Sequence, residues 1–198
     1  MCKRRLFIFL ILFTYSTAVG KGFTYGIEWG GSFSVIDCHN YNYLIESGYR
    51  MNSTDISYGG KVNALFLANI GYVFADRFQV SLYSGYEGVD RNVRVVPILL
   101  RGTFFNNGVK SDGLLAYFGG GVGITDIEPR SIILSRGGVG YRFVLSKATS
   151  LDLILSAGIS IRNPDLFDPD SHMPIADNRI TVNNLYVGKL GLSMALSF

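Results

Sequence analysis

Bulky apolar residues alternate with small or polar ones along most of the chain, and this pattern recurs eight times. From residue 23 to residue 35, every odd position holds an apolar, aromatic or glycine residue, and the even positions between them are small or polar. A period of two is that of a β-strand with two different faces. The pattern returns at residues 61–74, 78–89, 93–105, 114–124, 133–145, 151–161 and 180–198. The alternation therefore predicts an all-β domain of eight antiparallel strands.

The two faces of these strands differ in size as well as in polarity. One carries most of the aromatic and branched aliphatic residues, and the other carries glycine, serine and alanine with a few long charged residues. Eight strands enclose only enough room for side chains to fill, so the bulky face would overpack the interior. A closed barrel pairs every backbone group within the protein, as a bilayer requires. We therefore predict an eight-stranded antiparallel transmembrane β-barrel with an up-and-down meander over residues 21–198.

The amino-terminal segment has the three parts of a secretory signal peptide. Basic residues at positions 3–5 precede an apolar stretch at 6–13, and small residues lead to Ala18 and Gly20. The apolar stretch is too short to span a bilayer, which needs about 20 residues. We expect a signal peptide over residues 1–20, cut after Ala18 or Gly20.

The net charge of the mature chain excludes an electrostatic attraction to nucleic acid. The whole sequence has 18 basic and 15 acidic residues, and three of the basic ones lie in the signal peptide. The mature chain is therefore neutral, and we expect no nucleic-acid partner. Its one cysteine, Cys38, cannot form an intramolecular disulfide.

The lengths of the connections predict the orientation of the barrel. Short connections follow the second, fourth and sixth strands, at residues 75–77, 106–113 and 146–150, whereas the long ones include residues 36–60 and 162–179. Outer-membrane barrels have short periplasmic turns and longer outer loops. Both chain termini are therefore expected on the periplasmic side.

The inward face carries charged residues that need partners or water, because an isolated buried charge is costly. These are Glu28, Lys61, Glu87, Arg101, Arg136, Arg142, Asp152 and Lys189. Counted from the periplasmic ends of the strands, Glu28, Glu87, Arg136 and Lys189 fall at similar heights. We predict a plug of ion pairs that joins Glu28 to Lys189 and Glu87 to Arg136. A narrow polar pore or a gate is the alternative.

The end of the chain carries the most specific pattern, alternating apolar residues before a terminal aromatic: Leu190, Leu192, Met194, Leu196 and Phe198. Residues 138–143 and 96–100 also have recurrent strand patterns. In these features the chain resembles the small eight-stranded outer-membrane barrels, the OmpA/OmpX-like and opacity-type group. The resemblance implies export across the periplasm with chaperones, and insertion into outer-membrane lipid of a Gram-negative cell by the outer-membrane assembly machinery. It also implies that the terminal residues are the assembly signal.

Catalytic residues are not expected. A nucleophilic site needs a base within reach of a hydroxyl and a third group that orients the base. The histidines His39 and His172 lie in predicted outer loops, and Ser171, Asp168 and Asp170 are close to His172 in sequence. Neighbours in one loop seldom form such a triad, so we expect no enzyme.

A metal site is not expected either. Asp165, Asp168, Asp170 and Asp177 make the last long connection acidic, and loop carboxylates suit calcium. Their spacing lacks the glutamate and the pattern of an EF-hand, so we expect neither a metal nor another cofactor.

Loops on a rigid scaffold commonly carry function, and the tyrosines in residues 36–60 suit a contact surface. We therefore expect a non-enzymatic protein with an envelope-structural or surface-interaction role, whose surface partner contacts residues 36–60 and 162–179. A narrow channel for small solutes and a lipid A-modifying enzyme are the alternatives.

Overall fold

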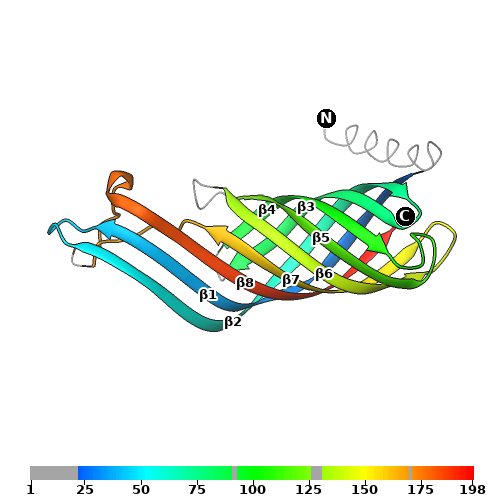
Figure 1. The fold of residues 1–198 in the computed structure, drawn as a ribbon, viewed down its shortest axis with the longest axis horizontal. Coiled ribbons are helices and arrows are strands. Elements are labelled where there is room, and N and C mark those ends of the chain that lie inside the picture. The colour runs from blue at the N-terminus through cyan, green and yellow to red at the C-terminus, as the bar shows by residue number, and fades with distance from the viewer. Residues whose placement is uncertain (1–21, 91–92, 126–130, 170) are drawn as a thin grey trace, which may run out of the picture.

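The computed structural model describes residues 22–90, 93–125, 131–169 and 171–198. Eight antiparallel strands form one closed barrel in which each strand pairs with the next and the last pairs with the first (Figure 1). They are β1 (Phe23–Leu44), β2 (Arg50–Ala75), β3 (Phe78–Asp90), β4 (Val93–Phe105), β5 (Gly113–Ile124), β6 (Ile132–Val144), β7 (Ser150–Arg162) and β8 (Ile180–Ser197), with a short 3-10 helix, η1 (Asp177–Arg179), before β8. Within the described residues, none of the helical structure is long and apolar enough to cross a membrane. The predicted antiparallel barrel with meander topology is confirmed.

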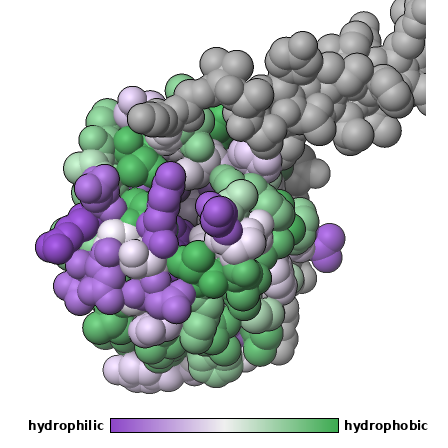
Figure 2. Space-filling view, turned by 90° about the vertical axis from the view of Figure 1, so that its right-hand side faces the viewer, coloured by the Kyte–Doolittle hydropathy of each residue, from purple (hydrophilic) through white to green (hydrophobic). Residues whose placement is uncertain are grey.

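The bulky face of the strands points away from the barrel axis, as predicted. Phe66 and Leu192 are 54% and 68% exposed, and Trp29, which pairs with Phe66 and with Met194 on its two neighbouring strands, lies on the same outward face. Figure 2 looks onto the end of the barrel at which β1 begins and β8 ends, where hydrophilic residues gather, with hydrophobic residues around the flanks. Such an apolar flank is suited to lipid.

Aromatic side chains gather at the end of the barrel at which β1 begins and β8 ends. The rings of Phe23 and Tyr72 lie 5.1 Å apart edge to face, and those of Tyr25 and Phe198 stack at 5.5 Å. Aromatic girdles of this kind are typical of the headgroup level of outer-membrane barrels.

Residues 36–60 are not a loop, and that prediction is wrong. The β1–β2 ladder continues from the pair Ile36 and Tyr58 to the pair Leu44 and Arg50, so that only residues 45–49 form a turn. β8 accompanies β1 on its other side. We call this three-stranded sheet, formed by residues 36–44 of β1, 50–58 of β2 and 180–188 of β8, the projecting sheet. It extends past the rest of the barrel (Figure 1).

The alternation fails in this segment because both faces of the projecting sheet carry polar residues. A register shift between Ser34 and Ile36 also changes which positions of β1 continue the inner face of the barrel. His39 lies on that inner face, paired with Leu185, while Asn40 lies on the outer one. The other long connection lies between β7 and β8, as expected.

Candidate functional site in the barrel interior and on the projecting sheet

The inward charges form three groups, and the central one surrounds Arg101. Its Nη1 donates to Oε2 of Glu28 at 2.7 Å, and the hydroxyl of Ser193 donates to Oε1 of the same carboxylate at 2.8 Å. The guanidinium lies 4.0 Å from the ring centroid of Tyr83 and 4.0 Å from that of Tyr117. Arg101 thus joins a buried ion pair to two cation–π contacts.

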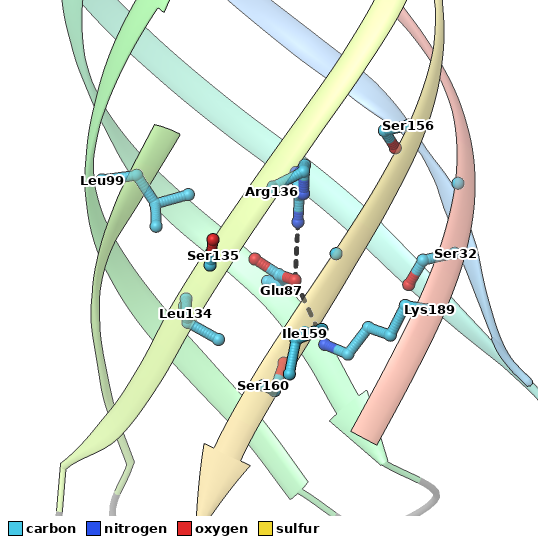
Figure 3. A pocket seen from close by; sticks show the side chains of 12 residues that line it. Ser32, Glu87, Leu99, Leu134, Ser135, Arg136, Ser156, Ile159, Ser160 and Lys189 are labelled. Carbon is cyan, nitrogen blue, oxygen red and sulfur yellow. Dashed lines mark hydrogen bonds and ion pairs between the residues drawn. The ribbon is translucent and has the colours of Figure 1, made fainter. Parts of the chain in front are cut away.

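A second group surrounds Glu87, nearer to the projecting sheet (Figure 3). Oε1 of Glu87 lies 2.6 Å from Nη2 of Arg136 and 3.3 Å from Nζ of Lys189. Lys189 also donates to the carbonyl of Gly88. Among the described residues, Oε2 of Glu87 is buried without a hydrogen-bond partner. A cavity of about 20 Å³ adjoins the group, which is room for a single water molecule.

The third group lies toward the end of the barrel at which β1 begins and β8 ends. Nε and Nη2 of Arg142 donate to the two carboxylate oxygens of Asp152 at 2.7 and 2.6 Å. Nη1 donates to the carbonyl of Val109 in the β4–β5 turn at 2.9 Å, and the guanidinium lies 4.1 Å from the ring centroid of Phe105. This bidentate pair is stronger than an arginine–carboxylate pair joined by a single hydrogen bond.

The pair of Glu87 with Arg136 forms as predicted, whereas the predicted pair of Glu28 with Lys189 does not. Lys189 is the cross-strand neighbour of Ser34, six residues along β1 from Glu28, which corresponds to about 20 Å of strand. The shear of the barrel, which the sequence did not reveal, separates the two residues. Lys61 is 29% exposed and pairs with Asp37 at 3.1 Å, at the base of the projecting sheet rather than deep inside the barrel.

Sequence reasoning missed the large apolar side chains of the interior. A buried cluster fills the barrel near the projecting sheet: Leu65, Leu67, Tyr83, Val89, Val93, Val95, Leu99, Ile132 and Leu134. A signal for part of it was available, because Arg101 fixes the phase of β4 and places Val93, Val95 and Leu99 on the same inward face. The interior is therefore filled by aliphatic groups as well as by ion pairs.

The inner face of the projecting sheet carries a polar cluster. Nε2 of His39 lies 3.0 Å from the amide oxygen of Asn183. The hydroxyls of Tyr41 and Ser53 donate to the two carboxylate oxygens of Asp55, each at 2.9 Å. These contacts link the three strands of the sheet to one another.

The β7–β8 connection packs against the tip of this sheet. Leu166 forms an apolar cluster with Tyr43 and Ile45, and further residues surround it: Tyr41, Met51, Ile175 and Ile180. The carboxylate of Asp168 accepts the backbone N–H of Glu46 at 3.0 Å. Burial, together with Tyr41 and the Asp168 carboxylate, raises the pKa of Tyr43. The connection is thus tied to the β1–β2 hairpin.

The described residues considered for catalysis lie in two places, His39 on β1 and the others in the β7–β8 connection. Asp168 is buried and also accepts the backbone N–H of Ser171 at 3.2 Å, so it shapes the connection. His172 has a positive φ of 56° and is exposed, and Asp170 lies outside the described residues. Within the described part of the chain, no group of three or more histidine, cysteine, aspartate or glutamate residues is placed to hold a metal ion.

Comparison with known proteins shows likeness in fold alone. The sequence matches no protein-family model and no curated protein. OprG from Pseudomonas aeruginosa, an outer membrane protein, is 12% identical, with a TM-score of 0.50 over 89% of this chain and 96% of that one. AlkL, an outer membrane protein solved in lipid bilayers, is 13% identical, with a TM-score of 0.47 over 89% and 90% of the two chains. The outer membrane protease OmpT from Escherichia coli is 9% identical, with a TM-score of 0.44 over 90% and 96%. The fold agrees with the resemblance of the sequence to small outer-membrane barrels.

Proposed function

We propose that this protein is an integral β-barrel of the Gram-negative outer membrane whose projecting sheet makes contacts at the cell surface, without catalysis. The outward apolar face and the aromatic girdle support the membrane location. The short turns beside the termini support a periplasmic position for that end. By the same argument, the projecting sheet and the β7–β8 connection lie outside the cell.

The observation that carries the surface role is the contrast between the barrel and the projecting sheet. Ion pairs and an aliphatic cluster pack the described interior of the barrel. The three strands that continue past it expose backbone and side chains on a rigid support, and such a support suits binding.

The location and orientation are tested by cysteine labelling on intact cells. In a Cys38→Ser background, Tyr49→Cys at the hairpin tip should react with a membrane-impermeant maleimide. Lys110→Cys, in a turn at the opposite end, is the matched control and should react only after the outer membrane is permeabilised. The reverse result would overturn the orientation.

The surface role is tested with a shortened hairpin. Asp37 and Ser57 are paired across β1 and β2, so a two-residue Asn-Gly turn can join them. Cells that make the full chain should associate with each other or with protein-coated surfaces more than cells that make the shortened chain. Equal behaviour at equal surface amounts would contradict the role.

A second candidate is a gated path for small ions, favoured by the sharing of Glu87 between two cations beside a cavity. Glu87→Gln removes the charge that holds Arg136 and Lys189 together. In planar bilayers the unaltered protein should give no steady current steps if the barrel is closed. Steady steps that appear only in Glu87→Gln would support the gate, and steps in the unaltered protein would overturn the closed barrel.

A further inference from the structure

The apolar outer surface of the barrel extends further on the side of β8, β1 and β2 than on the opposite side. β3 ends at Asp90, which falls beside Val62 when the register of the β2–β3 ladder is continued. Past this height, the outer face of β2 still carries Tyr58 and Ile56. Val62 and Tyr58 are 81% and 79% exposed, more than any other large hydrophobic side chain of the described residues.

Two rows of outward residues carry this surface across the projecting sheet. The first row contains Tyr58, Ile36 and Gly188, and the second contains Ile56, Cys38 and Tyr186. The ring of Phe33 lies across Gly60, and the side chain of Ile36 lies across Gly188, because a Cβ at either glycine would overlap it. The apolar surface of the barrel therefore continues onto the sheet.

The outer face of the projecting sheet carries no acidic residue. Both acidic residues of the sheet, Asp37 and Asp55, lie on its inner face. Beyond the two apolar rows, the outer face carries amides and a hydroxyl: Asn40, Asn42, Asn52, Thr54 and Asn184. Arg50, which donates to Asn42 at 2.9 Å, lies near the tip. The face thus changes from apolar groups through neutral polar groups to a cation, which is the order suited to acyl chains, the interface and anionic headgroups.

We propose that the outer face of the projecting sheet lies against lipid of the outer leaflet, as a one-sided extension of the lipid-facing surface of the barrel. A contiguous apolar patch is unfavourable in water and marks a contact surface, and this patch is continuous with the surface that faces lipid. The inference deepens the proposed function and rests on its membrane location. It assigns the outer face of the sheet to lipid and leaves the inner face to a surface partner.

This contact requires the barrel to tilt toward β1 and β2. From Val62 to Ile56, the strand advances about 20 Å, which at a strand tilt of about 45° is about 14 Å of height. The headgroup layer accounts for about 5–7 Å of this height. A tilt of the molecule supplies the rest, as it does where an apolar surface is longer than the bilayer is thick.

The test attaches the fluorophore NBD to the native Cys38 of the full chain, in phosphatidylcholine nanodiscs that hold one copy each. Cys38 lies in the second apolar row, so the fluorophore should emit at a shorter wavelength than in water. Lipids that carry a doxyl group near the glycerol end of the acyl chain should quench it. The matched control is Ser57→Cys in a Cys38→Ser background. Ser57 lies between Ile56 and Tyr58 in sequence but on the inner face, so its fluorophore should emit as in water and be quenched several-fold less.

A pair of charge variants tests whether the apolar row holds the lipid. Ile56→Asp places a carboxylate beside Cys38 on the outer face and should reduce the quenching at Cys38 several-fold, because a charge facing lipid is costly. Ser57→Asp adds the same charge to the inner face and should leave the quenching unchanged. Retention of the compact gel mobility before boiling shows that both variants are folded.

Three results would each overturn the proposal: emission at Cys38 as in water, equal quenching at Cys38 and Ser57→Cys, or equal effects of Ile56→Asp and Ser57→Asp. Emission at a shorter wavelength without quenching by the doxyl lipid would show that protein covers the face, and the proposal would also fail. Quenching of Trp29 by the doxyl lipid in the same nanodiscs checks the membrane location. If Trp29 is quenched and the Cys38 label is not, only this inference fails; if neither is quenched, the membrane location fails as well.

Discussion

Among single residues, Arg101 connects four strands of the barrel through its side chain. From β4 it reaches Glu28 on β1 and lies between the rings of Tyr83 on β3 and Tyr117 on β5. A planar guanidinium can donate to a carboxylate and stack on rings at the same time, which an ammonium group cannot do equally well.

Arg101→Met should lower the free energy of unfolding by about 3–5 kcal/mol, because it leaves the Glu28 carboxylate buried without its cation. Arg101→Lys should have a smaller effect, since the charge remains and only the stacking is lost. Urea unfolding in detergent micelles, followed by fluorescence, measures both. The control Lys61→Met removes the partly exposed ion pair with Asp37 and should lower the free energy of unfolding by about 1 kcal/mol or less. Equal losses in the two pairs would contradict this ranking.

The sequence was sufficient to identify the inward charges but not all of their partners. A charge at a position where its neighbours two residues away are small reveals the inner face, as at Glu28 between Gly26 and Gly30. The choice of partner depends on the stagger between strands, which sets the heights of Glu28 and Lys189. That stagger arises from closure of the whole ring and has no local sequence signal.

At the scale of elements, the end of β8 closes the barrel against the start of β1. The backbone N–H of Phe198 donates to the carbonyl of Tyr25 at 2.8 Å, and the backbone N–H of Tyr25 donates to the carbonyl of Phe198 at 3.2 Å. The stacked rings of these two residues add an aromatic contact at the same rim. The role of residues 190–198 as an assembly signal stays a prediction.

Phe198→Ala should reduce the amount of assembled barrel in the outer membrane several-fold, because it removes the terminal aromatic of that signal. The amount is measured by immunoblot of unboiled samples. Phe74→Ala is the matched control, since Phe74 is also an exposed aromatic but lies on β2. A similar loss in both variants would assign the effect to the girdle instead of the signal.

The shortened hairpin also tests how the β7–β8 connection is held. Replacing residues 38–56 by a two-residue turn removes Tyr43, Ile45 and Met51, against which the connection packs. Limited proteolysis should then cut within residues 163–179, while the barrel keeps its heat-modifiable mobility. Loss of that mobility would show that the hairpin is needed for the barrel itself.

The strands within the barrel could be predicted to within one or two residues, as β4 illustrates, because one face meets lipid and the other a packed interior. The continuation of β1 and β2 past the barrel could not. There, Asn40 and His39 lie on opposite faces and both are polar, so the period of two carries no contrast in polarity.

For the molecule as a whole, the fluorescence of Trp29, the only tryptophan, reports which face of the strands points outward. Its outward position predicts that lipids brominated on the acyl chains quench its fluorescence strongly in liposomes, while aqueous iodide does so weakly. Unfolding in urea should reverse the two sensitivities. Weak quenching by brominated lipid in the folded protein would contradict the outward position.

The ladder between β1 and β8 joins the first strand of the barrel to the last, from the pair Gly26 and Ser197 to the pair Tyr43 and Ile180. The barrel therefore cannot close until β8 is in place. Before that, the partly formed sheet has two unpaired edge strands, and such edges are prone to aggregate. A chain that lacks β8 should therefore not close into a narrower barrel. It should instead form an open sheet that aggregates unless a chaperone binds it.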